Sequence, residues 1–360
     1  MKLKKTISAL VMIVALISIP MAIPTFAMPG NVSDYTETQL TVTTIRDLPD
    51  GGKEYVYNID GIENVFPVPP QGFNPLTASD ALLKEYHFQD RPTGAEDLTR
   101  WKDVMSHYKT IAVPNLKKTN RKSILQSSAS ASNLNAPNWS GYINEGQTWN
   151  DVVGDYTQPS MGSGSPASSY ECSWVGLGGK NSPALIQAGT GMDNDTNSYY
   201  AWYEYIDLNG VDPNNGMKKI SLPIHANDRI QVEVSHDAVS LYTQFNFSNY
   251  TTGVYSNNYI LQLSNNYYDS STAEWIDERP RGSGFSYHPL MNYRMNTWSG
   301  CYNKLTQYPN TYHEIWDYTY QPVYMYTSLD SNGNPSGNLL SIPSSLMSGT
   351  SFNDMFVASQ

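Results

Sequence analysis

The sequence predicts an all-β protein, built as a sandwich of antiparallel sheets. Its 360 residues are 39% hydrophobic but only 15% charged, and they include 27 Tyr, 25 Gly and 22 Pro, residue types that favour strands and turns. Side-chain types alternate with a period of two at 229–234 and again at 322–328. Asn-Gly pairs at 209–210 and 332–333 supply turns. Many short strands at close spacing, with few helical patterns, indicate a sandwich.

The first 27 residues have the pattern of a secretory signal peptide. Three lysines within the first five residues precede an apolar stretch over 7–19, and residues suited to cleavage follow at 25–27. The apolar stretch is shorter than the roughly 20 residues of a membrane span, and Pro20 and Pro24 follow it. We therefore expect cleavage rather than a membrane anchor, and a mature protein that is secreted, extracellular and not attached to a membrane.

Residues 28–135 are expected to form a small, partly helical pro-segment that ends in a linker. Ser79 can cap a short helix over 81–86. The apolar stripe of an amphipathic helix follows at Leu98, Trp101, Met105 and Tyr108. A basic tract over 117–122 then leads into the Ser/Ala stretch 127–132. A proenzyme can be cut in such a stretch, although an ordinary interdomain linker has the same composition.

Residues 136–360 are expected to form the sandwich domain. Besides the two alternating segments, strands are predicted at 173–177, 184–188, 199–206, 240–247, 259–264 and 273–276. Residues 1–135 carry 14 of the 22 basic and 13 of the 33 acidic side chains, which leaves 8 basic and 20 acidic side chains for this domain. A surface of that composition offers no basic patch for phosphate groups, so no nucleic acid partner is expected.

The sequence lacks the residues that several kinds of catalytic site require. Cys172 and Cys301 both lie in the exported domain, where an oxidising compartment favours a disulfide between them over a catalytic thiol. The six histidines include no pair with metal-ligand spacing such as H-E-x-x-H, and we expect neither a metal nor a cofactor. No G-x-S-x-G elbow, Walker loop or G-x-G-x-x-G occurs. Carboxylate and carboxamide chemistry remains.

Gln187, Glu204 and Glu274 each lie on an apolar face of a predicted strand. Their apolar neighbours two residues away are Leu185, Trp202 and Ile276. Burying a bare carboxylate is costly, so such a group must be paired, protonated or functional, unless the strand faces solvent at that point.

Five motifs follow one another along the sandwich domain. They are 138–142 (NWSGY), 173–179 (SWVGLGG), 185–189 (LIQAG), 200–204 (YAWYE) and 273–276 (AEWI). In order and approximate spacing, they resemble the motifs of the glutamic endopeptidases, the eqolisin family. Each motif alone is weak, whereas five in order are specific. A signal peptide and a pro-segment also fit this family, whose members are made as secreted proenzymes.

The resemblance implies two curved antiparallel sheets, concanavalin-like or jelly-roll-like, with Gln187 and Glu274 as a catalytic dyad. Glu274 would be the general base on a water molecule that attacks the scissile carbonyl, and would then return the proton to the leaving amine. Gln187 would orient the water and stabilise the oxyanion. By the same resemblance, four further residues are expected to bind substrate, with core packing as the alternative for the two tryptophans: Trp139, Trp174, Glu204 and Glu278.

The sequence departs from the fungal members of the family at two acidic positions. Those members carry Asp where Gly178 and Tyr200 stand in this chain. The acidic network behind the dyad is therefore expected to be thinner, which affects the pH optimum and the side-chain preference.

We expect a secreted, acid-active endopeptidase, a monomer that acts on proteins or peptides and is inhibited by its own pro-segment. The alternative from another class is a carbohydrate-binding module or glycoside hydrolase on a similar sandwich, with Glu204 and Glu274 as its carboxylate pair. An adhesin that keeps only the fold is a third possibility. A glycosidase gives Gln187 no chemical role, so this residue separates the first two readings.

Overall fold

The computed structural model describes most of the chain. The described residues are 37–39, 41–59, 62–86, 88, 91, 95–106, 108–111, 117–119, 134–180, 182, 184–207, 215–260, 263, 271–281 and 286–360. The predicted signal peptide (1–27) and the Ser/Ala stretch (127–132) lie outside them. No helix in these residues is long and apolar enough to cross a membrane.

Seven strands form the first layer of a sandwich, and each neighbouring pair is antiparallel. Their order is β13 (Gly216–Ile220), β12 (Ser198–Asp207), β11 (Ala184–Asp193), β10 (Tyr170–Gly178), β17 (Thr272–Glu278), β8 (Trp139–Glu145) and β20 (Thr319–Tyr326). The short strand β7 (Leu134–Ala136) runs parallel to β20. The sandwich domain therefore begins within the sheet at Leu134.

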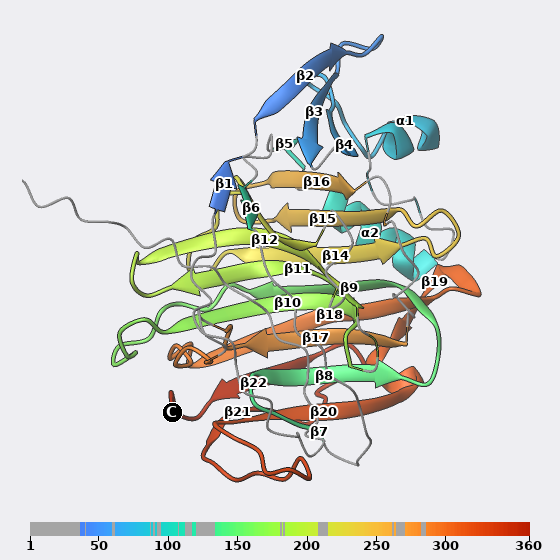
Figure 1. The fold of residues 1–360 in the computed structure, drawn as a ribbon. Helices are drawn as coiled ribbons and strands as arrows, with labels where there is room; N and C mark the ends of the chain where they lie inside the picture. Colours follow the sequence, from blue (N-terminus) through green and yellow to red (C-terminus); the bar gives the residue numbers. More distant parts are fainter. Residues whose placement is uncertain are drawn as a thin grey trace, which may run out of the picture.

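The second layer is also antiparallel and is joined to the first along one edge. Its order is β16 (Val254–Ile260), β15 (Thr243–Asn249), β14 (Arg229–His236), β9 (Trp149–Thr157), β18 (Met295–Leu305), β22 (Phe352–Phe356) and β21 (Leu339–Pro343). Strand β19 (Tyr308–Glu314) pairs with β18, the 3-10 turn η2 (Ile315–Asp317) follows, and the pairing of β20 with β21 connects the two layers. Figure 1 looks onto the layers, whose strands run side by side across the view. The predicted all-β sandwich is confirmed.

The main hydrophobic core lies between the two layers. Val175, Ile186 and Trp275 of the first layer pack in one cluster with Val232 and Phe245 of the second, and all five are fully buried. These residues follow the period of two along their strands, so the intervening residues of the first layer point to its opposite face.

That opposite face of the first layer is apolar as well, and we call it the tryptophan face. Its buried cluster includes Trp139, Trp174, Trp202, Leu185 and Ile276. A sheet that is apolar on both faces accounts for the long buried runs in β10 and β11.

The segment that precedes the sandwich contains more β-structure than predicted. Two helices, α1 (Asp80–Glu85) and α2 (Ala95–Ser106), accompany a separate three-stranded antiparallel sheet of β2 (Val42–Asp47), β3 (Lys53–Ile59) and β4 (Ile62–Val68). Figure 1 shows this sheet at the end of the sandwich next to β16. Tyr57 and Phe66 of this sheet are buried and belong to the main core cluster.

Three short strands from the same segment join the sandwich. Strand β6 (Lys117–Thr119) pairs with the edge strand β13, β1 (Glu37–Gln39) pairs with β6, and β5 (Thr110–Ile111) pairs with β16. The segment therefore adds backbone pairing to the outer strands of both layers.

The predicted disulfide between Cys172 and Cys301 is wrong, because both are buried thiols in this structure. Cys172 belongs to the tryptophan face, where its Sγ lies 3.6 Å from the hydroxyl of Tyr200, whereas Cys301 packs in the main core. Strand alternation thus puts the two sulfur atoms on different sides of the first layer, which a count of cysteines does not reveal. Burial raises the pKa of the Cys172 thiol.

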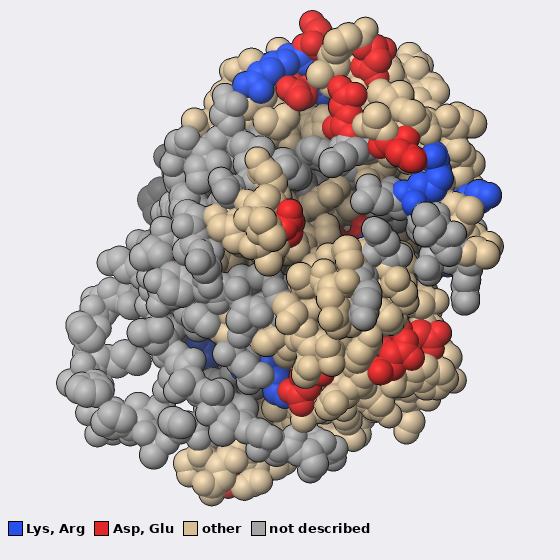
Figure 2. Space-filling view, turned by 90° about the vertical axis from the view of Figure 1, so that its right-hand side faces the viewer, with Lys and Arg blue, Asp and Glu red and all other residues tan. Residues whose placement is uncertain are grey.

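Acidic side chains gather on one part of the described surface. On the face shown in Figure 2, Asp and Glu side chains lie along the upper rim, with fewer Lys and Arg side chains among them. This end of the molecule carries β2 to β4 and α1 in Figure 1.

Candidate active site

Backbone pairing places Gln187 and Glu274 in one cross-strand row of the first layer. Gln187 of β11 pairs with Gly176 of β10, and Glu274 of β17 pairs with the same glycine from its other side. Glu204 of β12 pairs with Gln187 and extends the row. Directly paired residues of an antiparallel sheet point to the same face, so these side chains all lie on the tryptophan face.

Gly176 leaves no side chain between Gln187 and Glu274. A Cβ atom at this position would lie 2.7 Å from the Trp174 ring and 3.2 Å from Leu185. Because neighbouring strands are about 4.8 Å apart, the backbones of Gln187 and Glu274 are separated by about 10 Å. A carboxamide and a carboxyl group therefore flank a position that carries no side chain of its own.

A hydrogen bond sets the orientation of the Gln187 amide. Its Nε2 donates to Glu204 Oε2 over 3.0 Å, and the exposed fractions of the two residues are 0% and 1%. Among the described residues, Gln187 Oε1 meets no hydrogen-bond donor although it is buried. Since a carboxamide nitrogen carries two N–H groups, the contact with Glu204 uses one of them and fixes which way the amide faces.

Glu274 also has a partner on its own strand. Thr272, two residues earlier and on the same face, lies with its Oγ1 2.9 Å from Glu274 Oε1. Both residues are fully buried.

The tryptophans beside the row are held by a carboxylate. Trp139 and Trp174 pack edge to face with ring centroids 4.9 Å apart. Glu278 accepts hydrogen bonds from Trp174 Nε1 at 2.8 Å and from Asn138 Nδ2 at 2.6 Å. Glu278, which was predicted to bind substrate, thus contacts Trp174 and Asn138 in this structure.

Comparison with known protein families decides the identity of this arrangement. Residues 137–335, more than half of the chain, match the model of the peptidase A4 family. The chain belongs to this family. It is therefore a glutamic endopeptidase, a hydrolase of proteins or peptides, and the resemblance carried by the five motifs is confirmed.

Solved structures of peptidases are similar to this A4 peptidase. Scytalido-glutamic peptidase with a peptide-based transition-state analogue has 22% identity and a TM-score of 0.49, covering 61% of this chain and 98% of that chain. SCP-B, an eqolisin in complex with the tripeptide Ala-Ile-His, has 21% identity and a TM-score of 0.48 at the same coverage. Aspergilloglutamic peptidase from Aspergillus niger has 22% identity and a TM-score of 0.41, covering 52% and 99%. No curated protein matches the chain.

The site of this A4 peptidase contains a third tryptophan that was not predicted as a site residue. Trp202 is fully buried in the same cluster as Trp139 and Trp174. The indole Nε1 atoms of Trp139 and Trp202 meet no acceptor among the described residues. The sequence could have indicated Trp202 through its spacing, because it precedes Glu204 by two residues on the same strand and therefore lies on the same face.

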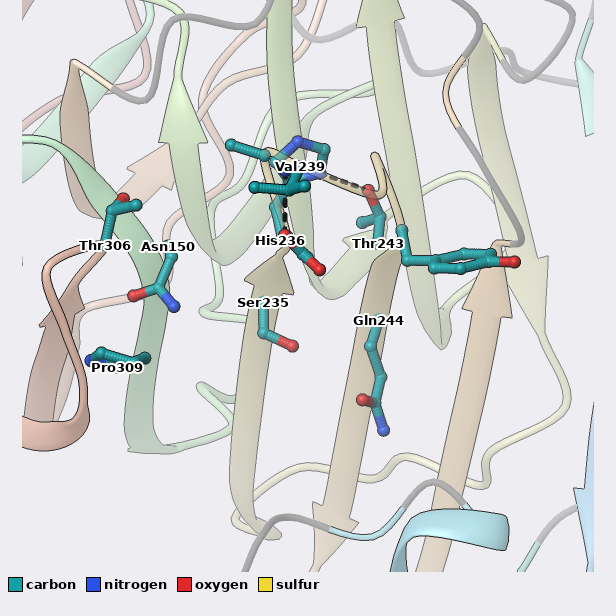
Figure 3. A pocket seen from close by; sticks show the side chains of 11 residues that line it. Asn150, Ser235, His236, Val239, Thr243, Gln244, Thr306 and Pro309 are labelled. Atoms are coloured by element: carbon teal, nitrogen blue, oxygen red, sulfur yellow. Dashed lines mark hydrogen bonds between the residues drawn. The ribbon is translucent and has the colours of Figure 1, made fainter.

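A separate hollow of about 450 Å³ lies at the ends of β14 and β15 in the second layer of the A4 peptidase (Figure 3). Its wall includes His236, whose Nδ1 lies 2.9 Å from Thr243 Oγ1, and Gln244. Burial lowers the pKa of His236 to about 4, so its imidazole is neutral above that pH. No residue of the dyad row lines this hollow. Within the described part of the chain, no three His, Cys, Asp or Glu side chains are grouped to hold a metal ion.

Proposed function

We propose that this A4 peptidase cleaves peptide bonds with Gln187 and Glu274 as its catalytic dyad, most actively in acid. One observation carries the proposal: the two side chains flank Gly176 in a single row, on a face lined by tryptophans. A carboxylate that accepts a proton and an amide that donates a hydrogen bond are the groups required to activate water without a covalent intermediate.

In this mechanism the ionised Glu274 takes a proton from a water molecule as the water oxygen bonds to the scissile carbonyl carbon. One N–H of Gln187 donates to the oxyanion that forms, while Glu204 accepts the other N–H. Glu274 then gives its proton to the leaving nitrogen as the C–N bond breaks. The products are a carboxylic acid and an amine, and Glu274 is ionised again.

The amide at position 187 supports activity in acid. Two adjacent carboxyl groups would repel each other and share a proton, whereas Gln187 does not titrate. A Glu has an ordinary pKa of about 4.3, so a single carboxyl group can remain partly ionised in moderately acid solution. The acidic surface of the domain also loses charge and self-repulsion as the pH falls.

Several contacts support inhibition by the preceding segment, in a protein that we propose is exported as a proenzyme. Strand β5 of this segment pairs with β16 of the second layer, and Gln187 and Glu274 are fully buried in the full-length chain. Strand β6 also covers the edge of β13, three strands from Gly176. A substrate needs access to the row, so activity requires that this cover be cut or moved. The pairing of β7 with β20 favours a cut before Leu134.

The glycoside hydrolase alternative loses support from the same row. Its two carboxyl groups should lie about 5 to 9.5 Å apart. Glu204 and Glu274 are three strands apart, about 14 Å between backbones, and Gln187 lies between them, bonded to Glu204.

The dyad is tested by kinetics of Glu274→Gln and Gln187→Ala on an unfolded protein substrate between pH 2 and 7. We expect Glu274→Gln to lose at least about 1,000-fold and Gln187→Ala about 100-fold or more in kcat/KM. Gln244→Ala, which alters a glutamine of the second layer, is the matched control and should retain activity.

Full activity of Gln187→Ala would refute the dyad. Cleavage of oligosaccharides but not of protein would instead support the glycosidase. Absence of any cleavage by the full chain after incubation in acid, with intact folding, would support a binding protein that keeps only the fold.

A further inference from the structure

We propose that Thr272 is a positioning residue of the site, whose hydroxyl holds the Glu274 carboxyl group in place in both of its protonation states. The inference rests on the proposed role of Glu274 as general base. It concerns the support of that group rather than its identity.

The geometry around Thr272 offers two acceptors to one hydroxyl. Its Oγ1 lies 2.9 Å from Glu274 Oε1 and 3.1 Å from the carbonyl oxygen of Gly178, the last residue of β10. Thr272 is fully buried, so water does not compete for these contacts. A hydroxyl has one proton to donate and can accept as well, so the two contacts cannot both be donated by Thr272 at the same time.

This arrangement matches the two charge states that the reaction requires. When Glu274 is ionised, Thr272 donates its proton to Oε1 and stabilises the negative charge. When Glu274 has taken a proton from water on Oε2, its Oε1 is the carbonyl oxygen of the acid and still accepts the threonine proton, so the protonated Oε2 keeps its direction toward the leaving nitrogen. No covalent bond of Thr272 changes, and its hydrogen bond to Glu274 persists in both states.

Continuity of this kind is useful to a group that serves first as a base and then as an acid. A carboxyl group that lost its hydrogen bond on protonation could rotate away before it delivered the proton to the leaving amine. Valine has nearly the shape of threonine but can neither donate nor accept, whereas serine keeps both abilities.

Other charges near Glu274 remain constant in such variants. On the adjoining strands and loop, Lys180 pairs with Glu145 and with Gln321 Oε1, Glu204 accepts from Gln187, and Glu278 holds Trp174. These groups are engaged with partners of their own, so a change at position 272 removes the hydroxyl and leaves their charges in place.

The experiment measures kcat/KM against pH for the full-length protein after incubation in acid, in the wild type and in Thr272→Val and Thr272→Ser. We expect the acid limb of the Thr272→Val profile to move up by about one pH unit, because the ionised base has lost a stabilising donor. We also expect kcat to fall about 10-fold, and Thr272→Ser to stay within about 3-fold of the wild type with an unshifted limb. Gel electrophoresis of the same samples follows processing, and thermal unfolding follows stability.

Thr190→Val is the matched control, since Thr190 is a buried threonine whose Oγ1 bonds Tyr156 on the other face of the sheet. Its acid limb should coincide with that of the wild type. A Thr272→Val limb that also coincides with the wild type would overturn the inference, even if the variant were less stable. If Thr272→Val fails to fold, Thr272→Ala provides the same comparison. Retained activity in Glu274→Gln would instead refute the proposed function itself, so the two failures can be told apart.

Discussion

Glu204 decides which end of the Gln187 amide faces the reacting groups. Its Oε2 accepts the amide N–H over 3.0 Å in a fully buried contact. In Glu204→Leu this acceptor is lost and the amide can turn its oxygen toward the oxyanion, so we expect kcat/KM to fall about 100-fold. Glu204→Gln keeps an acceptor oxygen and should fall only about 10-fold. Steady-state kinetics with a peptide substrate measures both, and an unaltered Glu204→Leu would exclude an orienting role.

Single residues of the site differ in how far sequence alone could identify them. Gln187 and Glu274 stand in specific motifs, and the period of two predicts their face correctly. The roles of Thr272 and Glu278 depend on distances to Gly178 and Trp174, residues of another strand. No pattern within one strand contains that information.

At the scale of strands, Gly176 keeps the space between the strands of Gln187 and Glu274 open. A methyl group at this position would meet the Trp174 ring at 2.7 Å, which is closer than carbon atoms normally approach. We expect Gly176→Ala to lose about 1 to 3 kcal/mol of unfolding free energy, because the ring must move. Activity should fall more steeply than stability, because the added group also lies between the dyad side chains. Urea unfolding and kcat/KM together check this, and a variant normal in both would contradict it.

Strand positions were predictable where alternation is clean, and less so elsewhere. Strands β10, β11, β12, β14 and β17 coincide with predicted segments. Strand β16 occupies Val254–Ile260, before most of the predicted 259–264, and the sheet of β2 to β4 was not predicted. The pairing of β10 with β17 joins residues about 100 positions apart, and such registers follow from packing of both faces rather than from local propensity.

At the scale of the whole molecule, three buried carboxyl groups connect the two layers. Glu171 and Asp277 come from the first layer and Asp354 from the second, and Ser173 Oγ lies 2.7 Å from both Glu171 and Asp277. Burial, reinforced by the charge of Asp277, raises the pKa values of Glu171 and Asp354 well above those of ordinary carboxyl groups. Burial also raises the pKa of Asp277. The groups that face them include the buried hydroxyls of Tyr156 and Tyr293, whose pKa values burial raises too.

These shifts predict a protein that is more stable in acid. The folded state holds protons that the unfolded chain releases above about pH 4, so the contribution is complete below that pH and is lost as the pH rises through the raised folded pKa values. Thermal unfolding between pH 3 and 8 should show a steeper decline with rising pH in the wild type than in Asp354→Asn.

Asp330→Asn is the control for this prediction. Backbone hydrogen bonds from Asn334 and Asn332 lower the pKa of Asp330, so its contribution to stability is lost as the pH falls, in the opposite direction. Parallel curves for the wild type and Asp354→Asn would show that the buried cluster does not set the pH dependence.

Tyr57 and Phe66 belong to the same core as Phe352, which lies near the C-terminal end of the chain. That core is complete only when the segment before the sandwich and the last strands have met. A cut in the linker of the folded protein produces two polypeptides that share one hydrophobic core. Cleavage and dissociation are then separate events, and the second has its own barrier, because it exposes Tyr57, Phe66 and the apolar groups that they cover.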